Sequence, residues 1–162
     1  MPTFDIVSKI DGQTLDNAIN SAKREIGNRY DFKGSNSEIN LDKKTNRIEL
    51  HTEDDMKMDQ LEKVVIGQFV KNKLDPKSLD WGTDRYASGN MIKKDVSVRQ
   101  GIDRENAKKL VKKIKDGKFK VQASIMDDQV RVQSKKIDEL QSVIAFCRGL
   151  DFEIPLQYIN FK

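Results

Sequence analysis

The side chains in this sequence that are best suited to binding chemistry are cations and amides that alternate with apolar residues. Lys120 and Gln122 belong to one such run, Arg131 and Gln133 to a second, and Arg99 ends a third. Successive residues of a β-strand point to opposite faces, so each run places its polar members on one face. Arginine can grip two phosphate oxygens or read guanine, while glutamine offers both a donor and an acceptor. The pattern predicts a sheet face that binds a nucleotide, with an ordinary exposed polar face as the alternative.

A second group with binding potential lies in residues 30–35 (YDFKGS), a predicted surface loop. Phe32 could lay its aromatic ring over a base, and the neighbouring Lys33 could bind a phosphate. Packing of Phe32 within the protein is an equally good interpretation. Nucleotide contact by Phe32 and Lys33 is therefore a hypothesis that needs the structure.

The densest basic cluster of the chain falls on a predicted helix. Four of its lysines are Lys108, Lys109, Lys112 and Lys113. Residues 93–162 hold 16 Lys and Arg against 10 Asp and Glu, whereas the rest of the chain holds 14 against 16. Lysines spread around a helix act as separate point charges, which suits contact with a long polyanion such as RNA or tRNA. The alternative is a solvated helix that only aids solubility.

Reactive groups are scarce in this sequence. It lacks the glycine-rich pattern that precedes a lysine in P-loops, and its single histidine, His51, has no motif around it. The acidic pairs at 54–55 and 127–128 fall at a predicted helix start and in a turn, where aspartate is favoured without any metal. We therefore expect a protein that is not an enzyme and that holds neither a metal nor a cofactor.

Composition limits where the protein works. Apolar residues make up 36% and charged residues 35% of the chain, the balance of a soluble globular protein. No apolar run approaches the roughly 20 residues that a membrane span needs, and the first residues lack the pattern of a signal peptide. The only cysteine, Cys147, excludes a disulfide within the chain. We expect a cytoplasmic protein with no membrane partner.

An internal repeat organises the chain. The apolar spacing of one predicted helix recurs 92 positions later. The matched residues are Leu15, Ala18, Ile19 and Ala22 in the first copy and Ala107, Leu110, Val111 and Ile114 in the second. A second predicted helix, residues 59–66, likewise matches residues 138–145. The sequence thus predicts an internal duplication, with one domain over residues 1–90 and a basic one over residues 91–162.

Each copy can be divided into the same predicted elements, in the order strand, helix, strand, strand, helix, strand. The expected strands are residues 3–9, a hairpin of 119–125 with 130–132, and final strands at 78–81 and 156–161. Asp11 and Asp103 are the expected caps of the first helices, and Asp55 and Ser134 of the second. This order is the split βαβ of ferredoxin-like α/β sandwiches, an α+β fold with RRM-like topology. Exchange of the N-terminal strand between the two sheets is compatible with the repeat.

The sequence lacks the aromatic residues that form the RNA-stacking surface of an RRM. An RRM binds RNA through two or three aromatic residues on its central strands. The matching positions here are Arg47, Glu49 and His51 in one copy and Arg131 and Gln133 in the other. Any RNA contact would therefore have to use cations rather than stacked rings.

Several short motifs, in order along the whole chain, give it a resemblance to a known family. They are residues 1–8 (MPTFDIVS), 31–34 (DFKG), 100–102 (QGI), 114–116 (IKD), 120–123 (KVQA), 130–132 (VRV), 138–141 (DELQ), 155–157 (PLQ) and 160–161 (NF). Together they make the chain similar to the YajQ family of bacterial nucleotide-binding proteins. The resemblance implies two ferredoxin-like domains and binding of purine nucleotides, with cyclic di-GMP or RNA as ligands of some members.

The leading expectation is a non-enzymatic protein that senses or carries a purine nucleotide, such as GTP, ATP or cyclic di-GMP. The alternative is an adaptor that binds RNA, tRNA or a regulatory protein through its lysine-rich helix. The first function needs a wet, cationic sheet face, whereas the second needs only the helix surface.

Overall fold

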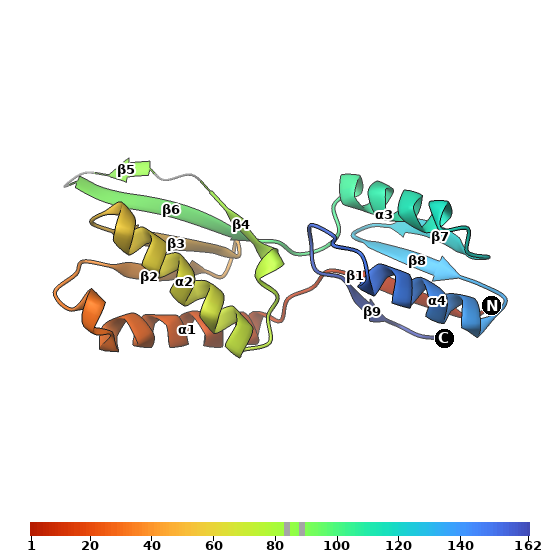
Figure 1. Cartoon of the computed structure of the whole chain (residues 1–162), viewed down its shortest axis with the longest axis horizontal. Coiled ribbons are helices and arrows are strands. Elements are labelled where there is room, and N and C mark those ends of the chain that lie inside the picture. The colour runs from red at the N-terminus through yellow and green to blue at the C-terminus, as the bar shows by residue number, and fades with distance from the viewer. Residues whose placement is uncertain (83–84, 88–89) are drawn as a thin grey trace. The chain divides into compact units, whose positions relative to one another are not determined.

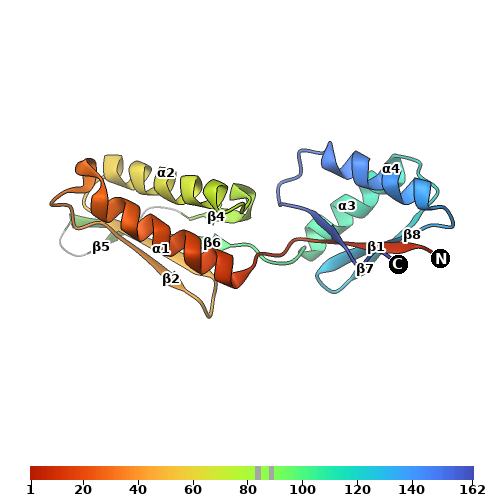
Figure 2. The same cartoon turned by 90° about the horizontal axis from the view of Figure 1, so that it is seen from below.

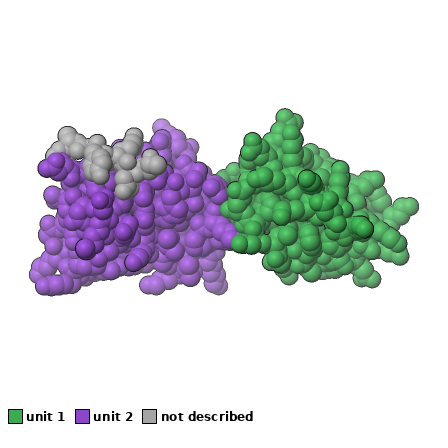
Figure 3. Space-filling view, turned by 45° about the horizontal axis from the view of Figure 1, so that its top comes forward, with its two compact units in different colours: residues 1–9, 100–162 green, residues 10–99 purple. Residues whose placement is uncertain are grey.

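The computed structural model describes residues 1–82, 85–87 and 90–162, and the chain divides into two compact units. Unit 1 contains residues 1–9 and 100–162, and unit 2 contains residues 10–99 (Figure 3). Part of the segment expected to link the two repeats, residues 83–84 and 88–89, lies outside the described residues.

Unit 1 is a four-stranded antiparallel sheet with two helices. Its elements are β1 (Thr3–Val7), α3 (Arg104–Asp116), β7 (Gln122–Met126), β8 (Gln129–Gln133), α4 (Ile137–Arg148) and β9 (Gln157–Ile159). The strands lie in the order β7-β8-β1-β9 (Figure 1). Both helices lie on the same side of this sheet, and the opposite face carries no helix of unit 1 (Figure 2).

Unit 2 has the same layers. Its elements are α1 (Gly12–Asn28), η1 (Tyr30–Phe32), β2 (Glu38–Asp42), β3 (Arg47–Thr52), α2 (Asp55–Lys71), η2 (Pro76–Ser78), β4 (Leu79–Trp81), β5 (Arg85–Ala87) and β6 (Met91–Val98). Its strands lie in the order β2-β3-β6-β4, and β5 also pairs with β6. Over the described residues, the two antiparallel sheets and four α-helices confirm the predicted α+β class and its ferredoxin-like arrangement.

Each sheet contains one central strand that comes from the other half of the sequence. β1 lies between β8 and β9, although those strands come from the second half. β6 lies between β3 and β4 of the first half. If the chain is divided at residue 90, residues 1–9 belong to the unit formed by the second half, and residues 91–99 belong to the unit formed by the first half. Both strands carry buried apolar residues at alternate positions, so local sequence permits either to occupy the centre of either sheet.

Burial of alternating side chains explains how unit 1 is assembled. Phe4 and Ile6 of β1 and Val130 and Val132 of β8 are fully buried under the helices. The helices contribute apolar stripes to the same core. Their members include Ala107, Leu110, Ile114, Leu140, Val143 and Cys147. The polar residues between the buried strand positions, such as Arg131 between Val130 and Val132, consequently project to the helix-free face.

The structure confirms some of the predicted helix-capping residues and not others. Asp11 caps α1, because its Oδ2 accepts a hydrogen bond from the backbone N–H of Thr14 at 3.2 Å. Asp103 occupies the same position before α3, but its carboxylate accepts from the side chain of Asn106 rather than from a backbone N–H of the first turn. The cap of α2 is Asp54 rather than the expected Asp55, since Asp54 Oδ1 accepts from the N–H of Lys57 at 2.7 Å. No helix in the described part of the chain is long and apolar enough to cross a membrane.

Candidate functional site

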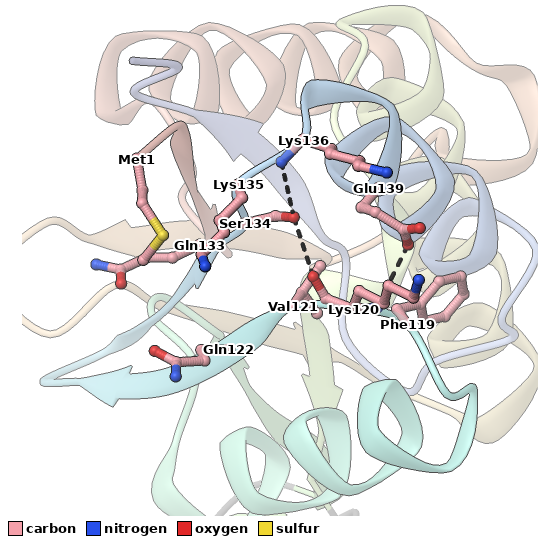
Figure 4. Close-up of a pocket in the computed structure, with 10 residues that line it drawn as sticks. All are labelled: Met1, Phe119, Lys120, Val121, Gln122, Gln133, Ser134, Lys135, Lys136 and Glu139. Atoms are coloured by element: carbon pink, nitrogen blue, oxygen red, sulfur yellow. Dashed lines mark hydrogen bonds between the residues drawn. The ribbon is translucent and has the colours of Figure 1, made fainter.

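A pocket of about 380 Å³ opens in unit 1 where β7 begins, β8 ends and α4 begins (Figure 4). Three of the predicted nucleotide contacts line it together: Lys120, Gln122 and Gln133. The other lining residues are Met1, Phe119, Val121, Ser134, Lys135, Lys136 and Glu139. The structure therefore gathers part of the predicted site at one end of the sheet.

Strand pairing positions the two amides of the pocket. Gln122 and Gln133 are opposite each other in the β7–β8 ladder, so their side chains project from the same face of the sheet. Figure 4 shows both pointing to the same side of the pocket. A base edge that reached this pair would meet donors and acceptors at once.

Ser134 ties the connection after β8 to the segment before β7. Its Oγ donates to the backbone carbonyl of Lys120 at 3.0 Å and accepts from the backbone N–H of Lys136 at 3.2 Å. Ser134 itself is 4% exposed. Because both bonds are to backbone atoms, they fix the paths of the two segments that carry the pocket's lysines and leave those side chains in solvent.

The pocket is cationic on balance. Lys120, Lys135 and Lys136 are all exposed, and Glu139 is the carboxylate among the lining residues. Three ammonium groups around one depression raise the local concentration of anions. Phosphate is the biological anion that such a cluster attracts most directly.

Phe119 supplies an aromatic wall. The side chain is half-buried, and its ring packs on that of Phe146 from α4, with centroids 5.3 Å apart and planes inclined by 59°. This contact holds the ring in place, and Phe119 is also one of the residues that line the pocket. An aromatic surface held in this way can stack on a planar base.

Arg131 lies on the helix-free face but does not line the pocket. Its Nε donates to Oδ1 of Asp5 at 2.9 Å, and Asn160 Nδ2 donates to Oδ2 of the same carboxylate at 2.9 Å. Asp5 is only 1% exposed. Hydrogen bonding to Arg131 lowers the pKa of Asp5 and raises that of Arg131. Arg131 is therefore first a partner of Asp5 within the fold.

Arg99 belongs to unit 2 and is not among the residues that line the pocket. Arg99 follows β6, which pairs with β3 and β4 in unit 2. One of its guanidinium nitrogens lies 3.5 Å from Oδ1 of Asp80, at the end of the same sheet. The expected grouping of Arg99 with Lys120 and Arg131 does not occur, because β1 fills the position in the unit 1 sheet that β6 was expected to take.

Phe32 and Lys33 line a different pocket, of about 560 Å³, in unit 2. Phe32 is 5% exposed and packs in the core of that unit. Arg29 and Lys57 lie over its ring, with their charged atoms 5.6 and 5.7 Å from the centroid. A ring so covered is a packing residue, so the hypothesis that Phe32 stacks on a base has no geometric support, whereas Lys33 remains exposed.

The lysines of α3 project into solvent. They are Lys108, Lys109, Lys112 and Lys113, and none of them lines the pocket beside β7. Lys109 forms an exposed ion pair with Glu153 at 3.3 Å. The buried members of α3, such as Leu110 and Ile114, face the core. The helix thus presents a basic surface of its own, separate from the pocket.

The described parts of the chain offer few side chains suited to catalysis or metal binding. Within residues 1–82, 85–87 and 90–162, no three His, Cys, Asp or Glu side chains form a group that could hold a metal ion. Burial raises the pKa of the Cys147 thiol to about 11, which keeps it protonated at neutral pH. His51 alternates with the buried Leu50 and Thr52 and so faces away from the core of unit 2.

Sequence reasoning missed several members of the pocket. Alternation predicts Phe119 as a strand residue but does not mark it as part of a site. Lys135 and Lys136 lie in a connection without a periodic pattern, and the helical pattern that includes Glu139 marks only the buried face of α4. The one available signal was two adjacent lysines directly after a predicted strand, at a point where a short connection must bring them back over the sheet end.

Comparison with known proteins identifies one family over nearly the whole chain. The family model described as nucleotide-binding protein YajQ-like matches residues 2–162. A protein from Rhodospirillum centenum that is named a nucleotide-binding protein is 54% identical over 162 residues, which cover 100% of this chain and 99% of that protein. Proteins with the same name from Oleidesulfovibrio alaskensis and Cytophaga hutchinsonii are 51% and 50% identical, over 100% of this chain and 99% and 100% of their own lengths. The chain belongs to the family of YajQ-like nucleotide-binding proteins.

Proposed function

We propose that this protein binds a purine nucleotide in the pocket between β7, β8 and α4, and that it acts in the cytoplasm as a sensor or carrier rather than as an enzyme. The observation that carries the proposal is the convergence of three lysines, two paired glutamines and an aromatic wall on one depression of about 380 Å³. The names of the relatives, which describe nucleotide-binding proteins, support the ligand class.

Each part of a nucleotide has a matching part of this pocket. Phosphate oxygens suit the exposed ammonium groups of Lys120, Lys135 and Lys136. A purine ring suits the face of Phe119, and its polar edge suits side-chain donors and acceptors. The volume lies in the range of about 300–1,000 Å³ that is usual for small-molecule sites. A cyclic dinucleotide would extend beyond it, along the helix-free face past Ser124 toward Arg131.

Titration calorimetry with GTP, ATP and cyclic di-GMP tests the proposal. The double variant Lys120→Ala/Lys136→Ala removes two pocket cations, and we expect it to weaken binding at least tenfold. Lys112→Ala/Lys113→Ala removes the same charge from α3, outside the pocket, and is the matched control. The proposal fails if the unmodified protein binds none of the three nucleotides, or if both double variants weaken binding equally.

A second function, RNA or tRNA binding, is favoured by one separate observation, the exposed lysines of α3. In that case Lys112→Ala/Lys113→Ala is the damaging variant. The affinity for RNA should fall linearly with salt on logarithmic axes, because each contacted phosphate releases counterions. A flat salt response, or full RNA affinity in that double variant, would contradict this second function. Docking of a regulatory protein on the same helix is also a proposal, and competition between that protein and RNA would test it.

A further inference from the structure

Glu139 is the lining residue that the phosphate-binding half of the proposal does not explain. A carboxylate repels phosphate, so a pocket that only held phosphates would be weakened by it. The side chain lies at the third position of α4 and lines the pocket beside Phe119 and Lys120 (Figure 4). Because Phe119 is the proposed stacking surface, Glu139 is placed to meet the edge of a base that stacks there.

The backbone holds Glu139 in place. Its own N–H donates to the carbonyl of Lys136 at 3.2 Å, as the first turn of α4 forms. Its Oε2 accepts a hydrogen bond from the backbone N–H of Lys120 at 3.3 Å. These two contacts fix the residue against the segment that also carries Phe119, so the carboxylate and the aromatic ring keep a constant relation to each other.

The carboxylate of Glu139 keeps most of its acceptor capacity. An ionised carboxylate offers about four lone-pair positions. Only the bond from Lys120 N–H uses one of them, and among the described residues neither of its oxygens forms an ion pair. The lysines of the pocket thus leave this carboxylate available to a ligand that brings two hydrogen-bond donors.

We propose that Glu139 makes the pocket selective for guanine over adenine. Guanine carries two adjacent donors, N1–H and the N2 amino group, spaced to meet both oxygens of one carboxylate. Adenine presents an unprotonated N1 at the same edge, which a carboxylate repels. With the base on Phe119, this edge meets Glu139 while the phosphates remain with the lysines. The inference rests on the proposed function and names the ligand class within it.

The size of the expected selectivity follows from the chemistry of such pairs. A bidentate contact to a base edge discriminates by about 1–3 kcal/mol, which corresponds to roughly fivefold to 150-fold in affinity. Inosine monophosphate keeps N1–H but lacks the N2 amino group, so its affinity should fall between those of GMP and AMP. Removal of the ribose 2′-hydroxyl should leave the preference unchanged.

The test is the dissociation constant of GMP, IMP, AMP and 2′-deoxy-GMP for the full chain, its Glu139→Gln and Glu139→Ala variants, and the control Asp138→Asn. Asp138 is the exposed neighbour on the same helical turn and does not line the pocket. We expect both Glu139 variants to reduce the GMP-to-AMP preference to near one, mainly by weakening GMP, and the control to keep it.

The outcomes separate the two proposals. Equal binding of GMP and AMP by the unmodified protein, or an unchanged preference in Glu139→Gln, would overturn the guanine inference and leave the nucleotide pocket standing. A loss of affinity for 2′-deoxy-GMP that vanishes in Glu139→Gln would assign the carboxylate to the ribose and would also overturn it. Binding of none of the four nucleotides would overturn the proposed function itself.

Discussion

At the scale of single residues, the least replaceable charge in unit 1 is Asp5. Its carboxylate is 1% exposed in the central strand of the sheet and is held by Arg131 and Asn160. These bonds keep its pKa below the usual value of 3.8. A group whose pKa is lowered by folding stabilises the fold above its unfolded-state pKa and loses that contribution as the pH falls through the folded value. Asp5 thus contributes fully at neutral pH and progressively less below about pH 4.

Replacement of this carboxylate should change both stability and its pH dependence. We expect Asp5→Asn to lower the free energy of unfolding at pH 7 by about 1–3 kcal/mol, since it leaves Arg131 without its anionic partner. The fall in stability between about pH 5 and pH 2 should be shallower than in the unmodified protein. Urea unfolding at several pH values measures both. Asp59→Asn, an exposed change on α2, is the control, and equal acid sensitivity in the unmodified protein and Asp5→Asn would contradict the assignment.

Cys147 should be inert in the folded protein. Its side chain is 2% exposed and its pKa is raised to about 11 by burial. Only the thiolate reacts, so a thiol reagent at neutral pH should modify the native protein roughly a hundredfold or more slowly than the urea-unfolded chain. Equal rates in the two states, measured by the absorbance of the released reagent, would show that the helix α4 opens readily.

The sequence predicts which strand residues point to the same face more reliably than it predicts which strands come together to line the pocket. Lys120, Gln122 and Gln133 follow from strand alternation, because that pattern is local. Arg99 obeys the same pattern and yet lies in unit 2. Which strand pairs with which is decided by contacts between distant segments, and no alternation within a single strand records them.

At the scale of elements, the two equivalent helix starts differ in a way that can be measured. Asp11 caps α1 with bonds to the N–H and the hydroxyl of Thr14 at 3.2 and 2.6 Å, whereas Asp103 accepts a bond from the side-chain amide of Asn106 at 2.5 Å but none from a backbone N–H in the first turn of α3. We therefore expect Asp11→Ala to lower the melting temperature more than Asp103→Ala. Circular dichroism during heating measures both, and a larger loss in Asp103→Ala would contradict this account of the caps.

Helices and hairpins were the most predictable elements. The apolar spacing over residues 104–116 and 137–148 matches α3 and α4, and the acidic turn at 127–128 joins β7 to β8 as expected. The caps of the second helices were less predictable. Ser134 proved to bind the backbone of Lys120 and Lys136 across the pocket, while α4 begins only at Ile137. Its hydroxyl serves a contact between segments, which a local cap pattern does not reveal.

At the scale of the whole molecule, the crossing of β1 and β6 makes the two halves of the sequence depend on each other. Residues 91–162 lack β1, the strand that carries Phe4, Ile6 and Asp5 between β8 and β9. A fragment of these residues alone should therefore remain largely unfolded, because its sheet is missing a central strand and part of its core.

A permuted chain tests the same idea from the opposite direction. Thr3 and Lys162 exchange two backbone hydrogen bonds of 3.0 Å, so the end of the chain lies beside its beginning. Residues 100–162 joined by a loop of about four residues to residues 1–9 should form an autonomous unit 1. Circular dichroism and cooperative urea unfolding measure this, and folding of residues 91–162 with failure of the permuted chain would contradict the exchange.

The central claim of this account is that a nucleotide binds where β7 begins, β8 ends and α4 begins. The most direct measurement is the change in backbone amide NMR signals of the isotope-labelled full chain during titration with GMP. The account predicts saturable shifts concentrated in residues 119–122 and 133–139, with Glu139 among them. Shifts concentrated on α3 or in unit 2, or no shifts at millimolar GMP, would contradict it.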